Sequence, residues 1–403
     1  MDDPRVERWA ASGAMALTGL PDETFGPPEF LVERVAQLGR HFSGLDVLAL
    51  LGERAALMGL WRRGATSCGG SCRLLPCAGG TMAVSLPREE DMDMVPAWLE
   101  LDDPPVSAPA TWSAVADVLL QRDPDVVLER ALLLGLPVAL VGEASRPRLP
   151  GHDPRAGVVP LRLGEAPRRP DATGALVVDL SALWAGPLCG DLLAESGANV
   201  IKVESTQRPD GARRGPRPFF DLLNGRKRSV ALDLETQAGV RILRDLVQQA
   251  DVVIEASRPR ALAQLGIDAH DAVAGGGPRV WISITGYGRS GADGGRVAFG
   301  DDAAAAGGLV TRTHAGPLFC ADAVADPLTG LTAADACIDM LRAGGRWLLD
   351  ISMASVSAEL AGPTLPVSTA LTVAEPHARH VVAEAPDLGA DTAHVLAELG
   401  IEA

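Results

Sequence analysis

Short apolar runs alternate with stretches of helical spacing in the middle of the chain. Residues 175–180, 199–204, 251–255 and 279–284 are apolar runs, which are typical of strands buried on both faces of a sheet. Between two of them, apolar side chains recur at helical spacing over residues 239–249. Strands that alternate with helices build βαβ units, so this region predicts an α/β fold with a Rossmann-like parallel sheet and flanking helices.

The residues before this region have a different pattern. Apolar side chains follow helical periodicity over residues 29–60 and 126–134, and a further helix is expected to start near Arg88. Residues 74–86 predict a hairpin, and residues 137–141 predict a strand. This mixture predicts a second, smaller α+β domain.

Composition supplies the domain boundaries. Residues 143–172 are rich in Pro, Arg and Gly and have little periodicity, which is typical of a linker. We therefore predict the smaller α+β domain over residues 1–150, a Pro/Arg-rich linker over 151–172 and the Rossmann-like domain over 173–355.

Charge and apolar content limit the expected partners. The formal net charge is -16, and such a field repels polyanions, so we expect no nucleic-acid partner. The first residues lack the basic-then-apolar pattern of a signal peptide, and the longest apolar run, 131–141, is far shorter than the roughly 20 residues of a membrane helix. We expect a cytoplasmic protein with no membrane partner.

The six cysteines are too sparse in 403 residues to form a disulfide scaffold. Cys68, Cys72 and Cys77 have no second Cys or His pair at zinc spacing. We therefore expect free thiols beside a glycine-rich turn, and no metal site.

A short basic stretch stands out on this acidic chain. Both lysines, Lys202 and Lys227, lie in it, together with Arg208, Arg213, Arg214, Arg217, Arg226 and Arg228. A phosphate-bearing ligand needs such side chains and free backbone N–H groups at helix starts. The alternative is a solvated loop with counter-charges. The turn Ala185–Pro187 follows the first predicted strand, where an open α/β sheet binds ligand, although it also fits an ordinary strand–helix turn.

Several segments, in order, resemble the class III CoA-transferase (CaiB/BaiF) family. The most specific is Asn224–Asp233, which is similar to the family's asparagine-lysine-arginine-serine segment. Ala325–Gly330 resembles the short motif that carries the family's catalytic aspartate. The other matching segments are Val178–Pro187, Gly197–Glu204, Ala250–Glu255, Ile284–Gly288 and Pro386–Gly400. The last of these predicts that residues 356–403 form a C-terminal tail that returns to the core.

The resemblance implies an acyl-CoA:carboxylate CoA-transferase that works through an aspartyl-CoA thioester on Asp326. Its substrates would be an acyl-CoA and a carboxylic acid, with no permanently bound cofactor, and the family pairing implies a homodimer. The residues implied in CoA binding are Trp184, Ala185, Gly186, Lys202, Arg226, Lys227, Arg228, Leu232 and Arg258.

The chemistry requires a carboxylate that attacks a thioester in a water-poor pocket, with backbone N–H donors for the oxyanions. Asp326 fits that role, and the glycine-rich segment Ser67–Cys72 could shield the intermediate. An Asp before a Pro is also a favoured helix N-cap, with Pro327 at the first helical position, and both roles can coexist. We expect Asp301, Asp302 and Asp322 to be loop or capping residues.

Departures from the family pattern keep two alternatives open. The smaller domain follows the Rossmann-like half in the family but precedes it here, as in a rearranged or truncated tandem member. Ser205 and Gln264 stand where arginines are common, so a non-catalytic CoA-binding paralogue is one alternative. The other is an acyl-CoA isomerase or racemase, or a dehydratase-like relative. The racemase branch uses a histidine that Phe299–Asp302 lacks, which disfavours proton transfer through an Asp and His pair.

Overall fold

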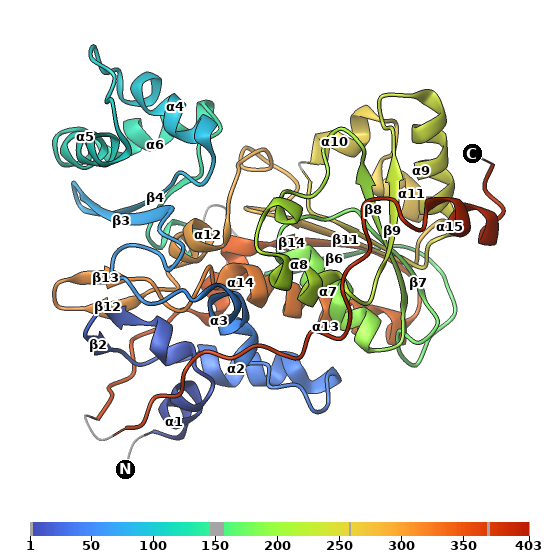
Figure 1. Cartoon of the computed structure of the whole chain (residues 1–403), viewed down its shortest axis with the longest axis horizontal. Helices are drawn as coiled ribbons and strands as arrows, with labels where there is room; N and C mark the ends of the chain where they lie inside the picture. The colour runs from blue at the N-terminus through green and yellow to red at the C-terminus, as the bar shows by residue number, and fades with distance from the viewer. Residues whose placement is uncertain (1–2, 146–156, 258, 369–370, 403) are drawn as a thin grey trace.

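The computed structural model describes residues 3–145, 157–257, 259–368 and 371–402. Figure 1 shows a sheet-containing half on the right and two smaller groups of elements on the left, at the top and at the bottom. Within the described residues, no helix is both long and apolar enough to cross a membrane.

Seven strands form the central sheet, in the order β6-β14-β11-β10-β7-β8-β9. All neighbouring pairs are parallel except β6 and β14. Counted along the chain from β7, the parallel strands have the 3-2-1-4-5-6 order of doubly wound sheets, which reverses direction between β7 and β10. The strands are β6 (Val158–Gly164), β7 (Leu176–Asp179), β8 (Asn199–Ser205), β9 (Arg228–Leu232), β10 (Val252–Glu255), β11 (Val280–Thr285) and β14 (Arg346–Ser352).

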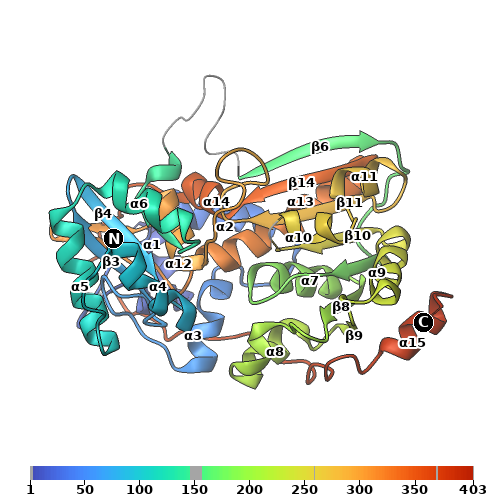
Figure 2. The ribbon, with the colours of Figure 1, turned by 90° about the horizontal axis from the view of Figure 1, so that it is seen from above.

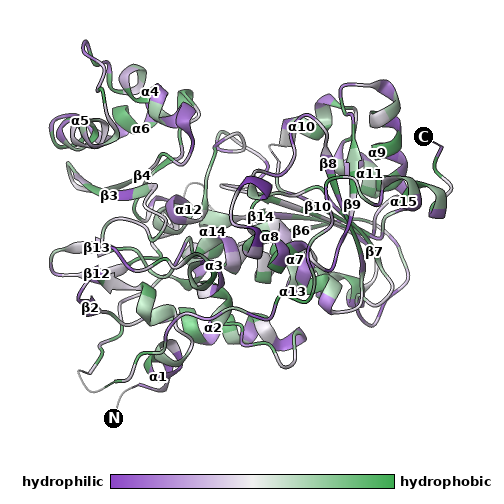
Figure 3. Cartoon of the chain, viewed as in Figure 1, coloured by the Kyte–Doolittle hydropathy of each residue, from purple (hydrophilic) through white to green (hydrophobic). Residues whose placement is uncertain are grey.

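Helices cover both faces of this sheet because alternate strand residues point to opposite faces. Val177 and Ile254 enter one apolar core, and their chain neighbours Val178 and Val253 enter the other. Figure 2 shows the strands side by side, and Figure 3 shows their strongly apolar character. The first core is covered by α7 (Ala185–Glu195), α8 (Arg217–Asn224) and α13 (Ala325–Ala343), and the second by α9 (Gln237–Gln249), α10 (Pro259–Gln264), α11 (Ala269–Ala274) and α15 (Thr392–Glu398).

The predicted α/β fold class and its four predicted strands are confirmed, whereas the linker prediction over 151–172 is wrong for part of its length. Residues 158–164 form β6, which pairs antiparallel with β14, so that Leu161 lies opposite Leu348. Pro160 is tolerated because β6 is an edge strand, where one row of backbone groups needs no partner. Its exposed side chains explain why the segment lacked a buried-strand pattern.

A small α+β unit lies apart from the sheet, at the upper left of Figure 1. Its three strands have the order β3-β4-β5, and the β3–β4 hairpin confirms the predicted one. Trp98, Trp112 and Leu119 are among the residues of its own apolar core. The unit contains β3 (Cys72–Cys77), β4 (Gly80–Ser85), α4 (Glu89–Leu99), α5 (Ala108–Gln121), α6 (Pro124–Leu133) and β5 (Val138–Leu140), and the short helix η4 (Glu143–Ser145) that follows packs on α12 and α14.

Residues 1–150 do not form a single smaller domain. Trp9, Val35 and Leu51 belong to the same core as Leu331 and Ile338 of α13, so the first part of the chain packs on the Rossmann-like half. The helical periodicity expected over residues 29–60 is divided among short helices. The elements of the first 60 residues are α1 (Pro4–Ala11), η1 (Ala14–Leu17), β1 (Gly19–Leu20), β2 (Glu23–Thr24), α2 (Leu31–Leu38), η2 (Gly39–His41), η3 (Ala49–Gly52) and α3 (Glu53–Met58).

The remaining segments connect these parts. Helix α12 packs against β4, β5 and α14, so it joins the small unit to the Rossmann-like half. After α14 the chain runs along the N-terminal elements, where the Ala374 N–H donates to Ala10, and then returns to β9, where the Asp391 N–H donates to Ser229. The elements are α12 (Gly300–Gly307), β12 (Thr311–Thr313), β13 (Gly316–Leu318) and α14 (Met353–Leu360).

Candidate active site

Asp326 lies in the first turn of α13, not at its N-cap, which is Val324. The preceding loop is strained, since Ala321 and Ala323 have φ values of 55° and 42°. Two side chains hold it in that shape. Thr18 Oγ1 accepts from the Ala321 N–H at 3.0 Å, and Asp301 Oδ1 accepts from the Ala323 N–H at 3.1 Å. Strain maintained by contacts of this kind is frequent at functional sites.

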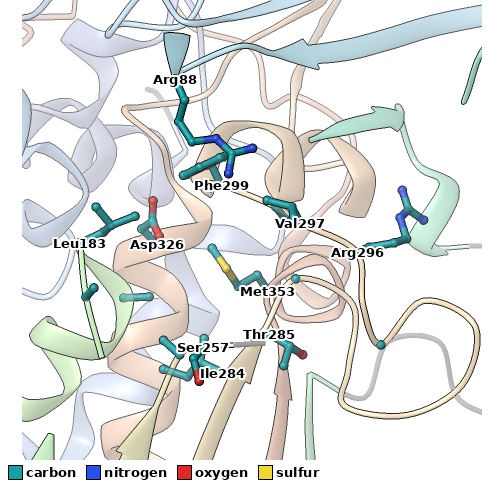
Figure 4. Close-up of a pocket in the computed structure, with 16 residues that line it drawn as sticks. Arg88, Leu183, Ser257, Ile284, Thr285, Arg296, Val297, Phe299, Asp326 and Met353 are labelled. Carbon is teal, nitrogen blue, oxygen red and sulfur yellow. The ribbon is translucent and has the colours of Figure 1, made fainter. Parts of the chain in front are cut away.

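Two cavities meet at Asp326. Both are lined by Leu183, Phe299 and Asp326, and Figure 4 shows the Asp326 carboxyl between the other two side chains. Leu183 also has a left-handed backbone, with φ at 69°. A single carboxyl group is therefore accessible from two separate spaces.

The first cavity, here called the sheet-edge pocket, has a volume of about 190 Å³. It lies at the carboxyl ends of three parallel strands, where Ala182 follows β7, Ser257 follows β10 and Thr285 ends β11. The strand order reverses between β7 and β10, and this is where doubly wound sheets bind nucleotides. Arg88 lies at the same pocket, with its guanidinium 5.7 Å from the Phe299 ring centroid.

The second cavity, here called the apolar pocket, has a volume of about 260 Å³. It lies between α3, α8 and α12 and includes Ser71, which precedes β3, and Ser85, the last residue of β4. Its apolar lining consists of Met58, Pro87, Leu183, Trp184, Ala212, Pro216, Phe219, Phe299 and Ala323. The N-terminal elements therefore complete a site that begins in the Rossmann-like half.

Three carboxyl groups, those of Asp301, Asp322 and Asp326, surround Arg54 beside these pockets, and Asp302 lies close to two of them. Arg54 binds Asp322 through two hydrogen bonds, with Nε 2.8 Å from Oδ2. Burial raises the pKa of Asp326 to about 7; Arg54 opposes that shift, and Asp301 and Asp322 add to it. Burial likewise raises the pKa of Asp301 to about 6, and that of Asp302 well above its ordinary range. We call Arg54, Asp301, Asp302, Asp322 and Asp326 the carboxyl cluster.

Position 300 requires a glycine because its backbone lies against Asp326. A Cβ at Gly300 would overlap Asp326 Oδ2 and the Ala323 carbonyl oxygen. The Gly300 N–H hydrogen-bonds the Asp326 carboxyl and lowers its pKa. Asp302 caps α12 by accepting from the Phe299 N–H at 3.0 Å, and this confirms its predicted capping role.

The two lysines are buried in ion pairs and do not line either pocket. Lys227 Nζ lies 2.8 Å from Asp179 Oδ2 and also donates to the Pro187 carbonyl and to Asn224 Oδ1. Lys202 Nζ lies 2.9 Å from Asp210 Oδ2 and donates to the Ser181 carbonyl. Burial lowers the pKa of Lys227, whereas neighbouring carboxylates outweigh burial and raise that of Lys202.

The other predicted binding residues are dispersed. Trp184 lines the apolar pocket, Ala185 lines the sheet-edge pocket, and Gly186 lies beside them, where a Cβ would overlap Ser181. The rest lie away from both pockets: Arg226 pairs with Asp191, Arg228 pairs with Glu398, and Leu232 is in the core. Arg258 lies outside the described residues.

Arg54, Arg88 and Phe299 line the pockets but are not among the residues that the sequence predicted for the site. Arg54 and its partner Asp322 are 268 positions apart, and nothing in the local pattern connects them. The glycine-rich segment Ser67–Cys72 was proposed as a shield, and Cys68 Sγ lies 3.6 Å from the Ala321 carbonyl oxygen in the loop before Asp326. Among the described residues, one group suited to a metal ion is found, Asp268, His270 and Asp271, and all three are exposed.

Comparison with known proteins identifies the family. The family model described as CoA-transferase family III matches residues 173–390, which is more than half of the chain. The chain belongs to CoA-transferase family III. The match covers the six parallel strands of the central sheet, Asp326 and most of the tail, and it leaves out the first 172 residues, which include β6.

Curated relatives carry CoA-transferase names. The succinate–glutarate CoA-transferase of Agrobacterium fabrum is 31% identical over 219 residues, or 49% of this chain and 55% of that protein. The (R)-2-hydroxy-4-methylpentanoate CoA-transferase of Clostridioides difficile is 36% identical over 130 residues, covering 29% and 32% of the two chains. A CaiB/BaiF family protein from Brucella suis matches with 30% identity and a TM-score of 0.43, over 48% of this chain and 55% of that one. This chain spans about half the length of the first of these relatives.

Proposed function

We propose that this protein transfers CoA between an acyl-CoA and a carboxylic acid, with Asp326 as the nucleophile. The observation that carries the proposal is the Asp326 carboxyl on the shared wall of two pockets, one at the nucleotide-binding edge of the sheet and the other apolar. A group that must contact both a CoA arm and an acyl group needs such a position. Membership of CoA-transferase family III supports the reaction class.

The proposed reaction has four exchanges. An Asp326 carboxylate oxygen attacks the thioester carbonyl carbon, the C–S bond breaks, and CoA thiolate leaves an acyl-aspartyl anhydride. The thiolate attacks the aspartyl carbonyl carbon, which releases the first carboxylate and leaves aspartyl-CoA. The acceptor carboxylate then attacks the aspartyl carbonyl carbon and displaces the thiolate. Finally, the thiolate attacks the acceptor's carbonyl carbon, which yields the new acyl-CoA and restores Asp326.

We propose that the CoA arm occupies the sheet-edge pocket. Ala185 begins α7 there, so backbone N–H groups at that helix start are available for polar atoms of the arm. Two arginines among the described residues line this pocket: Arg296 is buried and paired with Glu143, whereas Arg88 pairs with Asp91 and stays partly exposed. We therefore propose Arg88 as the cation that contacts an oxyanion or phosphate here. Trp184 and Gly186 remain proposed contacts of the CoA arm, whereas Arg226 and Arg228 line neither pocket. We also propose the homodimer that the family implies.

Trapping of the intermediate tests the proposal. The protein is incubated with an acyl-CoA and then with hydroxylamine, which converts an aspartyl thioester to a hydroxamate. Mass spectrometry should find the modification at Asp326, in the tryptic peptide 313–342. Omission of acyl-CoA is the control. An unmodified peptide across straight-chain, branched and aromatic acyl-CoA substrates would contradict the proposal.

One observation favours a second candidate function. Asp301 and Asp326 line the same pocket, and burial raises the pKa of both into the neutral range, so one can be protonated while the other is ionised. Such a pair can exchange the proton α to an acyl-CoA carbonyl. Deuterium incorporation from D₂O without any acceptor acid would identify this activity, whereas CoA transfer without incorporation would exclude it.

A further inference from the structure

The residues that line the apolar pocket indicate which acyl groups it can bind. Because both pockets open on Asp326, the substrate's carbonyl carbon must lie at their junction. If the CoA arm takes the sheet-edge pocket, the remainder of the acyl group extends to the other side, past Leu183 and Phe299. The following inference rests on that proposed function.

We propose that the apolar pocket selects acyl groups that carry no second carboxylate. Trp184 and Phe219 form one wall, with their ring centroids 5.2 Å apart at an interplanar angle of 88°. Met58 and Pro216 add further apolar surface. Burial of an alkyl or aromatic group against such a wall is favourable in proportion to the apolar area that it removes from water.

Among the described residues that line the apolar pocket, Arg54 is the one cation, and its charge is already neutralised. Arg54 lines the pocket, but two of its nitrogens bind Asp322, whose side chain is 0% exposed. The Arg54 Cζ also lies over the Trp184 ring, 5.3 Å from its centroid, which is within the range of a cation–π contact. An arginine held on two sides in this way is not available to a ligand carboxylate without loss of a buried ion pair.

The other charged groups of the pocket are acidic. Asp301 and Asp326 both line it, so a ligand with a distal carboxylate would bring a further negative charge next to them. A buried carboxylate without a cationic partner is strongly disfavoured. The pocket therefore selects by repulsion as well as by apolar contact, which is an effective way to reject a close analogue.

Matched donors test this selection. Transfer to one fixed acceptor is measured with hexanoyl-CoA and 3-phenylpropionyl-CoA against succinyl-CoA and glutaryl-CoA. We expect kcat/KM for the apolar donors to exceed that for the dicarboxylate donors by about a hundredfold. Equal or greater values for the dicarboxylate donors, with Asp326 labelled as expected, would overturn this inference alone. Absence of transfer and of Asp326 labelling with every donor would instead contradict the proposed function.

Two variants test whether the lack of an available cation in the apolar pocket causes the donor selectivity. Asp322→Asn frees Arg54, and we expect the ratio of glutaryl-CoA to hexanoyl-CoA activity to rise at least tenfold. Met58→Arg adds a cation to the pocket wall without breaking a buried pair, and it should change the ratio in the same direction even if Asp322→Asn fails to fold. Met94→Arg on α4 is the control, because Met94 is exposed and lines neither pocket. An unchanged ratio in Met58→Arg would contradict the inference.

Discussion

Two groups of buried charge in this protein differ in how completely they are paired. Near the strand ends of β7 and β8, three cations match three anions: Lys227 with Asp179, Lys202 with Asp210, and Arg213 with Glu204. We call these six residues the paired cluster. In the carboxyl cluster, one arginine interacts with three of the four carboxyl groups, and Asp302 is not one of the three.

The difference gives the carboxyl groups of the two clusters opposite pKa shifts. In the paired cluster, Lys227 and Lys202 lower the pKa of Asp179 although burial opposes its ionisation, so that carboxylate stays charged and bound. In the carboxyl cluster, burial raises the pKa of Asp326 to about 7 because too little positive charge faces it. A carboxyl that is not committed to a partner can exchange protons or form a covalent bond near neutral pH.

The largest expected effect is that of Asp326→Asn. Without the nucleophilic carboxylate, the rate of CoA transfer should fall by at least about a thousandfold while the fold is retained. Product analysis of CoA esters measures the rate, and circular dichroism checks the fold. Asp335→Asn is the matched control: Asp335 lies on the same helix and has a pKa raised to about 6, but it contacts Arg40 and lines neither pocket. A comparable loss of activity in that control would contradict a special role for Asp326.

Removal of a cation from the paired cluster should affect stability. Lys227→Met leaves Asp179 buried and unpaired, so we expect the free energy of unfolding to fall by about 3–5 kcal/mol, measured by urea denaturation. The double variant Lys227→Met/Asp179→Asn should recover part of this loss. A raised KM for acyl-CoA with unchanged stability would show that Lys227 binds ligand instead.

The pH dependence of kcat/KM tests the carboxyl cluster. Attack requires the ionised form of Asp326, whose pKa is about 7, so kcat/KM should rise roughly tenfold between pH 6 and pH 8. Arg54 lowers that pKa, so Arg54→Gln should move the rising limb to higher pH. A limb that ends near pH 4 in the unmodified protein would show that Asp326 is not protonated at neutral pH.

The smallest effect is expected at the surface. Arg228 pairs with Glu398, and both side chains are partly exposed, at 27% and 47%. Solvent screens such a pair, so Arg228→Ala should change the free energy of unfolding by less than about 1 kcal/mol, measured by thermal denaturation. It should also leave the KM for acyl-CoA unchanged, since Arg228 lines neither pocket; a several-fold increase would restore it as a CoA contact.

Local patterns predicted the elements that are buried on both sides. The four apolar runs form β7, β8, β10 and β11 because fully buried parallel strands need continuous apolar sequence. Edge strand β6 was missed, since its exposed residues and Pro160 lack that pattern. The first 60 residues were assigned to the wrong unit because their helical periodicity indicates an apolar face but does not identify the helix that the face contacts.

The amino-acid sequence by itself determined the α/β sheet, because strand burial is a local property. Asp326 became the candidate nucleophile through the resemblance of Ala325–Gly330 to a family motif, since an Asp before a Pro is otherwise a common helix cap. Only the tertiary structure decided which charges face a pocket. It buries Lys202 and Lys227 against carboxylates, and it brings Arg54 from 268 positions away to Asp322. Pairing and desolvation depend on neighbours that are distant in the chain, and these two effects determine whether a charged side chain stabilises the fold or is free for chemistry.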